Sequence, residues 1–140
     1  MIRITEHRAH DVVALQELFL RIRRSTFVWA ELSKFELSDF DKETEGEYIL
    51  VARMDEKPIG FIAVWVADRF IHHLYVDEAY QNQQIGTQLL NAIISKFGLP
   101  LRLKCEEKNT KAINFYQRKG FVEIEKGQSQ SGLYILFELR

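Results

Sequence analysis

A short polar segment between two apolar ones has residue types that suit the binding of an anion. Residues 77 to 86 read Asp-Glu-Ala-Tyr-Gln-Asn-Gln-Gln-Ile-Gly. A helix that begins near Gln84 would present unpaired N–H groups, and these can hold a phosphate without basic side chains. Backbones that approach an anion closely usually need several glycines, and here only Gly86 is present. The residue types alone therefore leave a plain strand-to-helix connection as the alternative.

Two adjacent histidines, His72 and His73, precede this segment and suit proton transfer. A neutral imidazole can take a proton from an ammonium group, directly or through a water molecule. Alternation along a strand sends the two rings to opposite faces of the sheet, unless a bulge changes the count. It puts His72 on the face of Phe70. The alternative is a pair of structural histidines.

The elements that must position these residues follow from the periodicity of the apolar side chains. Short connections join the early strands into an antiparallel meander, after which helices and strands alternate. The pattern predicts one α/β (α+β) domain over residues 1–140, with a mixed, mostly antiparallel sheet of about seven strands. The expected strands are Met1–Ile4, Tyr48–Arg53, Ile59–Ala67, Phe70–Val76, Leu101–Glu106, Phe121–Glu125 and Leu133–Leu139. The expected helices are Asp11–Arg24, one from near Gln84 to Phe97, and Asn109–Lys119, and residues 25 to 47 are not placed.

Composition excludes several classes of protein. The chain has 140 residues, with 19 basic and 20 acidic side chains and a formal charge of -1. A dedicated nucleic-acid binder needs a basic face, so we expect no nucleic-acid partner. No apolar stretch approaches the roughly 20 residues that cross a bilayer, and the N-terminus lacks the apolar core of a secretory signal. We therefore expect a cytoplasmic protein with no membrane association.

The run from Ile71 to Leu90 resembles the acetyl-CoA signature of the GNAT superfamily of N-acetyltransferases. In that family a strand ending in Leu-x-Val leads into a (Gln/Arg)-x-x-Gly-x-(Gly/Ala) loop that holds the pyrophosphate of coenzyme A. Leu74 and Val76 match the strand, and Gln81 and Gly86 match the first and last positions of the loop. Gln84 replaces the middle glycine, where a side chain either crowds the pyrophosphate or imposes a different backbone.

A second segment, Asn109 to Phe121, resembles the later signature of the same family, Asn-x-x-Ala-x-x-(Phe/Leu)-Tyr-x-x-x-Gly-Phe. The resemblance extends from Ile2 to Leu139 and implies helices on both faces of the sheet and acetyl-CoA as cofactor. It implies that Tyr116 acts as general acid, or as a strong hydrogen-bond donor, towards the departing thiolate. It also implies that Asn109 bonds the cofactor arm, in addition to capping its helix.

The resemblance implies the remaining site residues as well. Family members sometimes place a catalytic carboxylate on the face of Phe70, so we expect His72 to be the base and His73 to contact the acceptor. A backbone N–H of the Phe70–Val76 strand, in which the family often has a β-bulge, would bind the oxyanion. Phe27 and Trp29 fall where the family usually builds its acceptor pocket. The six carboxylates between Glu36 and Glu47 either steer a cationic amine or form a solvated loop, and we expect the loop. The expected cofactor-binding residues are Leu74, Tyr75, Val76, Gln81, Asn82, Gln83, Gln84, Ile85, Gly86, Thr87, Asn109 and Tyr116.

The expected activity is transfer of an acetyl group from acetyl-CoA to a primary amine, by direct attack in a ternary complex. The acceptor is a small molecule or a protein amine, and homodimers are frequent in the family. The alternatives are a non-catalytic module that binds or senses coenzyme A, and an interaction domain that retains the fold. Cys105 stands alone and is expected to be a buried small residue, not a nucleophile. No side-chain spacing suggests a metal site.

Overall fold

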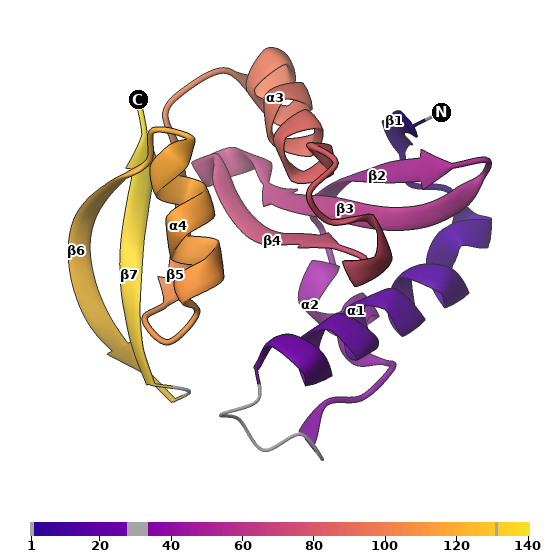
Figure 1. Cartoon of the computed structure of the whole chain (residues 1–140), viewed down its shortest axis with the longest axis horizontal. Helices are drawn as coiled ribbons and strands as arrows, with labels where there is room; N and C mark the ends of the chain where they lie inside the picture. The colour runs from indigo at the N-terminus through magenta and orange to yellow at the C-terminus, as the bar shows by residue number, and fades with distance from the viewer. Residues whose placement is uncertain (1, 28–33, 131) are drawn as a thin grey trace.

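Seven strands form one twisted sheet in the computed structural model, which describes residues 2–27, 34–130 and 132–140 (Figure 1). The strand order is β1-β2-β3-β4-β5-β7-β6, and the β4–β5 pair is parallel while every other pair is antiparallel. The prediction of a mixed, mostly antiparallel sheet of about seven strands is confirmed. The strands are β1 Ile2–Glu6, β2 Tyr48–Met54, β3 Lys57–Trp65, β4 Phe70–Val76, β5 Leu101–Glu106, β6 Val122–Ser129 and β7 Gly132–Leu139.

Two helices cover one face of the sheet. The apolar stripe of α1 (Val12–Thr26) includes Leu15 and Phe19 and packs on β2 and β3. The short helix α2 (Asp39–Thr44) adds Phe40, whose ring lies edge-on to Phe19 and to Phe61 of β3. Burial of these apolar side chains is what holds the helices on this face.

The opposite face of the sheet carries a second helical layer. Helix α3 (Ile85–Phe97) buries Leu89 and Ile93 against the β3 side chains that alternate with Phe61. Helix α4 (Thr110–Arg118) contributes Tyr116 to the same core cluster. The expectation of helices on both faces is therefore met.

The parallel pair β4–β5 is the point where the sheet opens. Its two strands share only the pairs Phe70–Arg102 and Ile71–Leu103 in the part of the chain that the structure describes. Beyond Ile71 the two strands diverge. Among the described residues, the later half of β4 therefore has hydrogen-bonded pairing with β3 on one side and none with β5 on the other. This divergence leaves a sheet edge inside the molecule, towards which α3 and α4 are directed (Figure 1).

Several expected boundaries differ from the structure. Strand β3 ends at Trp65, because the chain turns through a 3-10 segment at Val66–Asp68 and Arg69 takes a left-handed conformation. Strand β6 continues to Ser129, since its hairpin partner β7 pairs with it throughout. The unplaced residues 25 to 47 include α2, which is too short to show a helical period.

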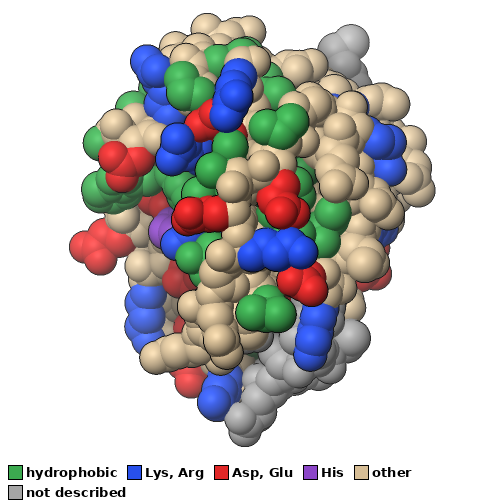
Figure 2. Space-filling model, turned by 90° about the vertical axis from the view of Figure 1, so that its left-hand side faces the viewer, with side chains coloured by type: hydrophobic (Ala, Val, Ile, Leu, Met, Phe, Trp, Pro, Cys, Tyr) green, Lys and Arg blue, Asp and Glu red, His purple; other side chains and the backbone are tan. Residues whose placement is uncertain are grey.

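The outer edge of the sheet is strand β6. Most of its side chains are exposed, and charges of both signs lie among scattered apolar groups on the face at this end of the molecule (Figure 2). Val122 and Leu133 are about half exposed there, at 49% and 52%. Charged side chains on an edge strand oppose pairing with other chains. None of the helices in the described ranges is long and apolar enough to cross a membrane.

Candidate functional site

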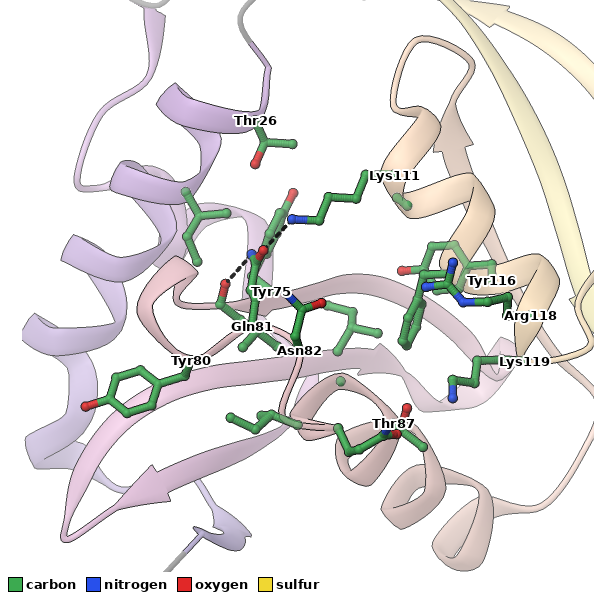
Figure 3. Close-up of a pocket in the computed structure, with 18 of the residues that line it drawn as sticks. Thr26, Tyr75, Tyr80, Gln81, Asn82, Thr87, Lys111, Tyr116, Arg118 and Lys119 are labelled. Atoms are coloured by element: carbon green, nitrogen blue, oxygen red, sulfur yellow. Dashed lines mark hydrogen bonds between the residues drawn. The ribbon is translucent and has the colours of Figure 1, made fainter.

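A cavity of about 310 Å³ lies where β4 and β5 diverge, with α1, α3 and α4 around it (Figure 3). Every residue expected to bind the cofactor lines it except Gln83, whose side chain is exposed to solvent. The expected cofactor-binding residues thus surround one cavity, although they come from β4, from the start of α3 with the loop before it, and from α4 with its N-cap. The lining residues that the sequence analysis did not assign to the cofactor are Ile22, Thr26, Tyr80, Lys111, Ala112, Phe115, Arg118 and Lys119.

The loop before α3 adopts the backbone that glycine usually provides. Asn82 has φ 66° and Gln84 has φ 64° and ψ 17°, so both residues are in the left-handed region. A side chain in this conformation costs roughly 1–2 kcal/mol. Left-handed residues next to right-handed ones turn successive N–H groups towards one side, which is the arrangement that binds anions. The replacement of the expected glycine by Gln84 thus changes the energetic cost of the loop and not its shape.

The first turn of α3 leaves its N–H groups free of the helix ladder. The first intrahelical bond runs from Gln88 N to Gln84 O at 2.9 Å. No side chain caps this end, since Gln84 makes no capping bond as the N-cap residue. The N–H groups of Ile85, Gly86 and Thr87 are available, and the positive end of the helix dipole lies with them. A phosphate group fits this position without any basic side chain.

Gln81 ties the loop to the elements on either side of it (Figure 3). Its Nε2 donates to Val76 O at 3.1 Å, and its Oε1 accepts from Lys111 Nζ on α4. Asp77 shapes the preceding turn, because Oδ1 accepts from Ala79 N at 3.0 Å and Oδ2 pairs with Arg21 of α1 at 2.7 Å. These contacts hold the loop against β4 and bring a cation to the mouth of the cavity.

Tyr116 projects from α4 into the cavity, with its hydroxyl on the side of β4 (Figure 3). Its ring is packed against Phe115, Phe121 and Phe137 and the residue is 8% exposed. Burial raises the pKa of Tyr116 above that of an ordinary phenol. The hydroxyl therefore stays protonated at neutral pH and acts as a donor. Asn109 begins the same helix, and its Oδ1 accepts from Ala112 N at 3.3 Å, which confirms the expected N-cap.

Strand β4 contains a β-bulge at His72. The register passes from Ala63–His73 to Val64–Ile71, so His72 has no partner on β3. The resemblance to the family implies a bulge in this strand, and the structure contains one. As a result both His72 and His73 are on the side of α1 and α2, with ring centroids 5.3 Å apart, while Leu74 and Val76 pack with the opposite cluster.

The two histidines lie beside the cavity and not in its wall. His73 is buried between Phe19, Phe61 and Tyr75, and its ring stacks on Tyr75, which does line the cavity. Burial lowers the pKa of His73 to about 3, assisted by the charges of His72 and Arg23. The expected contact between His73 and an acceptor does not match this position, because aromatic rings cover the imidazole. His72 is about half exposed, and its Nδ1 contacts the carboxylate of Glu47.

The acidic segment is only partly a solvated loop, which corrects the expectation. The side chain of Glu47 is 2% exposed, whereas that of Glu43 is 42% exposed and pairs with Arg23 at 3.1 Å. Desolvation raises the pKa of both carboxyl groups. Periodicity gives no indication that Glu47 is buried, because it is a single residue in front of β2.

Of the positions expected to form an acceptor pocket, Phe27 lies at the end of α1. It is half-buried, with its ring centroid 6.5 Å from that of Phe35, and does not line the cavity within the described ranges. Trp29 lies outside the described residues. Ile22 and Thr26 of α1 do line the cavity, although no sequence signal distinguished them from core positions. Cys105 is buried, and burial raises its pKa to about 12, as expected of an inert thiol.

Comparison with known families gives a match over most of the chain. The model described as the acetyltransferase (GNAT) family matches residues 12–121. An uncharacterised N-acetyltransferase of Methanocaldococcus jannaschii is 34% identical over 88 residues. That alignment covers 54% of this chain and 39% of the relative, so the chain spans well under half of the relative's length.

Solved structures agree with the fold at low sequence identity. A GCN5-related N-acetyltransferase of Rhodopseudomonas palustris superposes with a TM-score of 0.81 at 18% identity, covering 97% of this chain and 93% of that one. The PaiA N-acetyltransferase of Thermoplasma acidophilum, solved in complex with coenzyme A, has a TM-score of 0.79 at 20% identity, covering 99% of each chain. At this identity the likeness concerns the fold alone.

Proposed function

Because this chain belongs to the acetyltransferase (GNAT) family, we propose that it transfers an acetyl group from acetyl-CoA to a primary amine. The amine attacks the thioester directly while both substrates are bound. The observation that most strongly supports the proposal is that three features meet at one cavity. The left-handed loop at the start of α3, the open edge of β4 and the Tyr116 hydroxyl all face the same cavity.

The shape of the cavity supports coenzyme A as its occupant. The N–H groups of the loop and of the first turn of α3 suit the pyrophosphate, and Lys111 lies beside them. The open edge of β4 at Leu74 and Val76 offers backbone groups to an extended arm that carries amides, as to an added strand. A Cβ at Gly86 would lie 3.3 Å from the Phe115 ring, so this position must stay small for α3 and α4 to approach each other.

Acetyl-CoA supplies the acetyl group in activated form, as a thioester. Tyr116 donates a hydrogen bond from its hydroxyl to the sulfur as negative charge develops there. A backbone N–H of β4 near the bulge donates to the carbonyl oxygen. His72 takes a proton from the acceptor ammonium, because its imidazole is the accessible member of the histidine pair.

The acceptor would enter from the side of α1 and α2, where residues 36–47 hold six carboxylates and one lysine. Arg23 is already engaged by Asp39 and Glu43, each at 3.1 Å, so those charges compensate one another. The exposed Asp41 and Glu45 add negative charge at the surface of the same segment. A cationic small molecule or the amine of a protein fits this field better than an anionic acceptor.

Two measurements test the proposal. Coenzyme A and acetyl-CoA should raise the melting temperature of the protein at millimolar concentration, because they bind the folded state. Incubation with acetyl-CoA and a panel of primary amines should release free thiol in proportion to acetylated amine. Failure of both ligands to raise the melting temperature would refute the cofactor assignment. Binding without thiol release on any amine would favour a non-catalytic module that senses coenzyme A.

A further inference from the structure

The buried side chain of Glu47 contacts the half-exposed ring of His72. Glu47 is the residue before β2, and its side chain is 2% exposed although the residue comes from the acidic segment. Its Oε2 contacts Nδ1 of His72, the bulged residue of β4. A buried carboxylate in contact with one ring nitrogen of a half-exposed histidine determines which nitrogen carries the proton.

We infer that Glu47 is a positioning residue that holds His72 with its proton on Nδ1 and its lone pair on Nε2. This inference rests on the proposed acetyl transfer, for which it identifies the proton acceptor. The acceptor ammonium loses one N–H bond and His72 gains one at Nε2, and the electron pair left on nitrogen attacks the thioester carbonyl. No oxidation or reduction occurs, and Glu47 itself exchanges no proton.

The surroundings of the pair favour this division of roles. Besides Glu47, the charged or titratable groups near His72 are Glu43 of α2, Arg23 of α1 and the neighbouring His73. Arg23 is paired with Asp39 and Glu43, and His73 is buried and stays neutral. Glu47 is therefore the one carboxylate in direct contact with His72 among the described residues. When the imidazole of His72 gains a proton, its positive charge lies next to the carboxylate of Glu47.

The bulge explains why this pairing is possible. In a regular strand, Ile71 and His73 would share one face and His72 would point to the other. The extra residue places His72 on the same side as His73, above the chain that leaves α2. The bulge thus exposes backbone groups of β4 and puts the rings of His72 and His73 on one side of the sheet, the side of Glu47.

The same atoms also meet the spacing of a metal site, which is the competing interpretation. Ligand atoms of Glu47, His72 and His73 lie within 4.8 Å of one another. Oε1 of Glu47 and Nε2 of His73 are buried without a hydrogen-bond partner among the described residues. A metal would have to displace the contact between Glu47 and Nδ1 of His72, so the tautomer of His72 separates the two interpretations.

Nitrogen NMR of the histidine rings tests the inference without cofactor or acceptor. In metal-free wild-type protein at pH values where His72 is neutral, we expect His72 to carry its proton on Nδ1. In Glu47→Gln the proton should redistribute between the two nitrogens. Glu45→Gln is the matched control, with the same change of charge at an exposed position three residues after Lys42. An Nε2–H tautomer in the wild type would overturn the inference, as would stoichiometric zinc bound through the three side chains.

Kinetics then test the functional consequence. Glu47→Gln should lower kcat by about tenfold or more, a part of the roughly 10²–10⁴-fold that a general base contributes. Glu47→Asp should restore part of the rate, and the KM for the amine should change less than kcat, because Glu47 acts through His72 and does not touch the acceptor. An unchanged kcat in Glu47→Gln would overturn the role of Glu47. If the wild type acetylates no amine, the proposed function fails, and the NMR result still decides whether Glu47 sets the tautomer.

Discussion

The guanidinium of Arg53 and the carboxylate of Asp11 meet at two points inside the core, with Nη1–Oδ1 at 2.7 Å and Nη2–Oδ2 at 2.5 Å. Both side chains are almost completely buried, at 0% and 1% exposure. Arg53 Nε also donates to Thr5 Oγ1 at 2.8 Å, and Asp11 accepts from Arg8 N at 2.7 Å. The pair joins β2 to the start of α1, the helix that closes one side of the cavity.

Asp11→Asn should destabilise the protein strongly, because it leaves the buried charge of Arg53 uncompensated. Breaking one partner of a buried pair costs roughly 3–5 kcal/mol, measurable by urea denaturation. Glu56→Gln is the control, since it breaks an exposed pair with Arg3 and should cost less than about 1 kcal/mol. If the two substitutions lowered the free energy of unfolding equally, the buried pair would contribute no more to stability than the exposed one.

Acid should weaken the fold through the same pair. The hydrogen bond from Arg53 lowers the pKa of Asp11 below its usual 3.8. Below about pH 4 the unfolded chain therefore binds a proton that the folded chain does not. The stabilisation that Asp11 gives the folded protein is complete at pH values above the pKa of Asp11 in the unfolded chain. It is lost as the pH falls through the lower pKa of Asp11 in the folded protein. Between pH 5 and pH 3, the free energy of unfolding should fall more for the wild type than for Asp11→Asn. Parallel curves would rule out this linkage.

Gln84→Gly should stabilise the protein by about 0.5–1 kcal/mol, because glycine takes the left-handed backbone without strain. Gln83→Gly is the matched control at an adjacent exposed residue whose φ is negative, and it should destabilise by a similar amount. Thermal unfolding measures both effects. A lower melting temperature for Gln84→Gly would mean that the Gln84 side chain supports the loop.

Gly60→Ala should destabilise β3 and β4 by roughly 1–3 kcal/mol and weaken binding of coenzyme A. A Cβ at Gly60 would lie 2.9 Å from the backbone oxygen of Tyr75, so the open half of β4 must move. In Gly127→Ala the added carbon meets only the end of the Tyr134 ring, which can swing away. Calorimetric titration should show weaker binding in the first variant and not in the second.

Tyr116→Phe should lower kcat by about 10²-fold or more while the affinity for coenzyme A stays nearly constant, because only the proton donor is lost. Tyr134→Phe, on β7 and outside the cavity lining, controls for loss of a phenol elsewhere. Thiol release and calorimetry measure the two quantities. A full rate in Tyr116→Phe would transfer the role of proton donor to another group or to water.

Much of the architecture could be predicted from the sequence, because period and spacing encode it. Strand β4 and strand β5 have the expected bounds, and Asn109 caps its helix as its residue type indicates. Asparagine is common in the left-handed conformation that Asn82 takes, but glutamine is not, so the backbone at Gln84 could be expected only through the resemblance.

What the sequence did not predict depends on contacts between distant segments. Glu47 has the residue type of a solvated acid, and only the pairing of β4 with β3 brings His72 over it. Arg53 reads as an exposed charge in a strand until Asp11, 42 residues earlier, is placed beside it. Alternation also cannot show that His73 packs among Phe19, Phe61 and Tyr75, because the first two of these rings come from α1 and β3.

The divergence of β4 from β5 gives the sheet a third edge, in its interior. Exposed charges such as Arg3 on β1 and Glu123 on β6 discourage strand addition at the two outer edges. The interior edge at Leu74 and Val76 is shielded from strand addition by another chain, because it faces a cavity of about 310 Å³. We expect a single extended chain with amide groups to pair with this edge from inside the cavity, as an added strand would. We expect α3 and α4, whose side chains line the cavity, to keep the sheet of another molecule away from it.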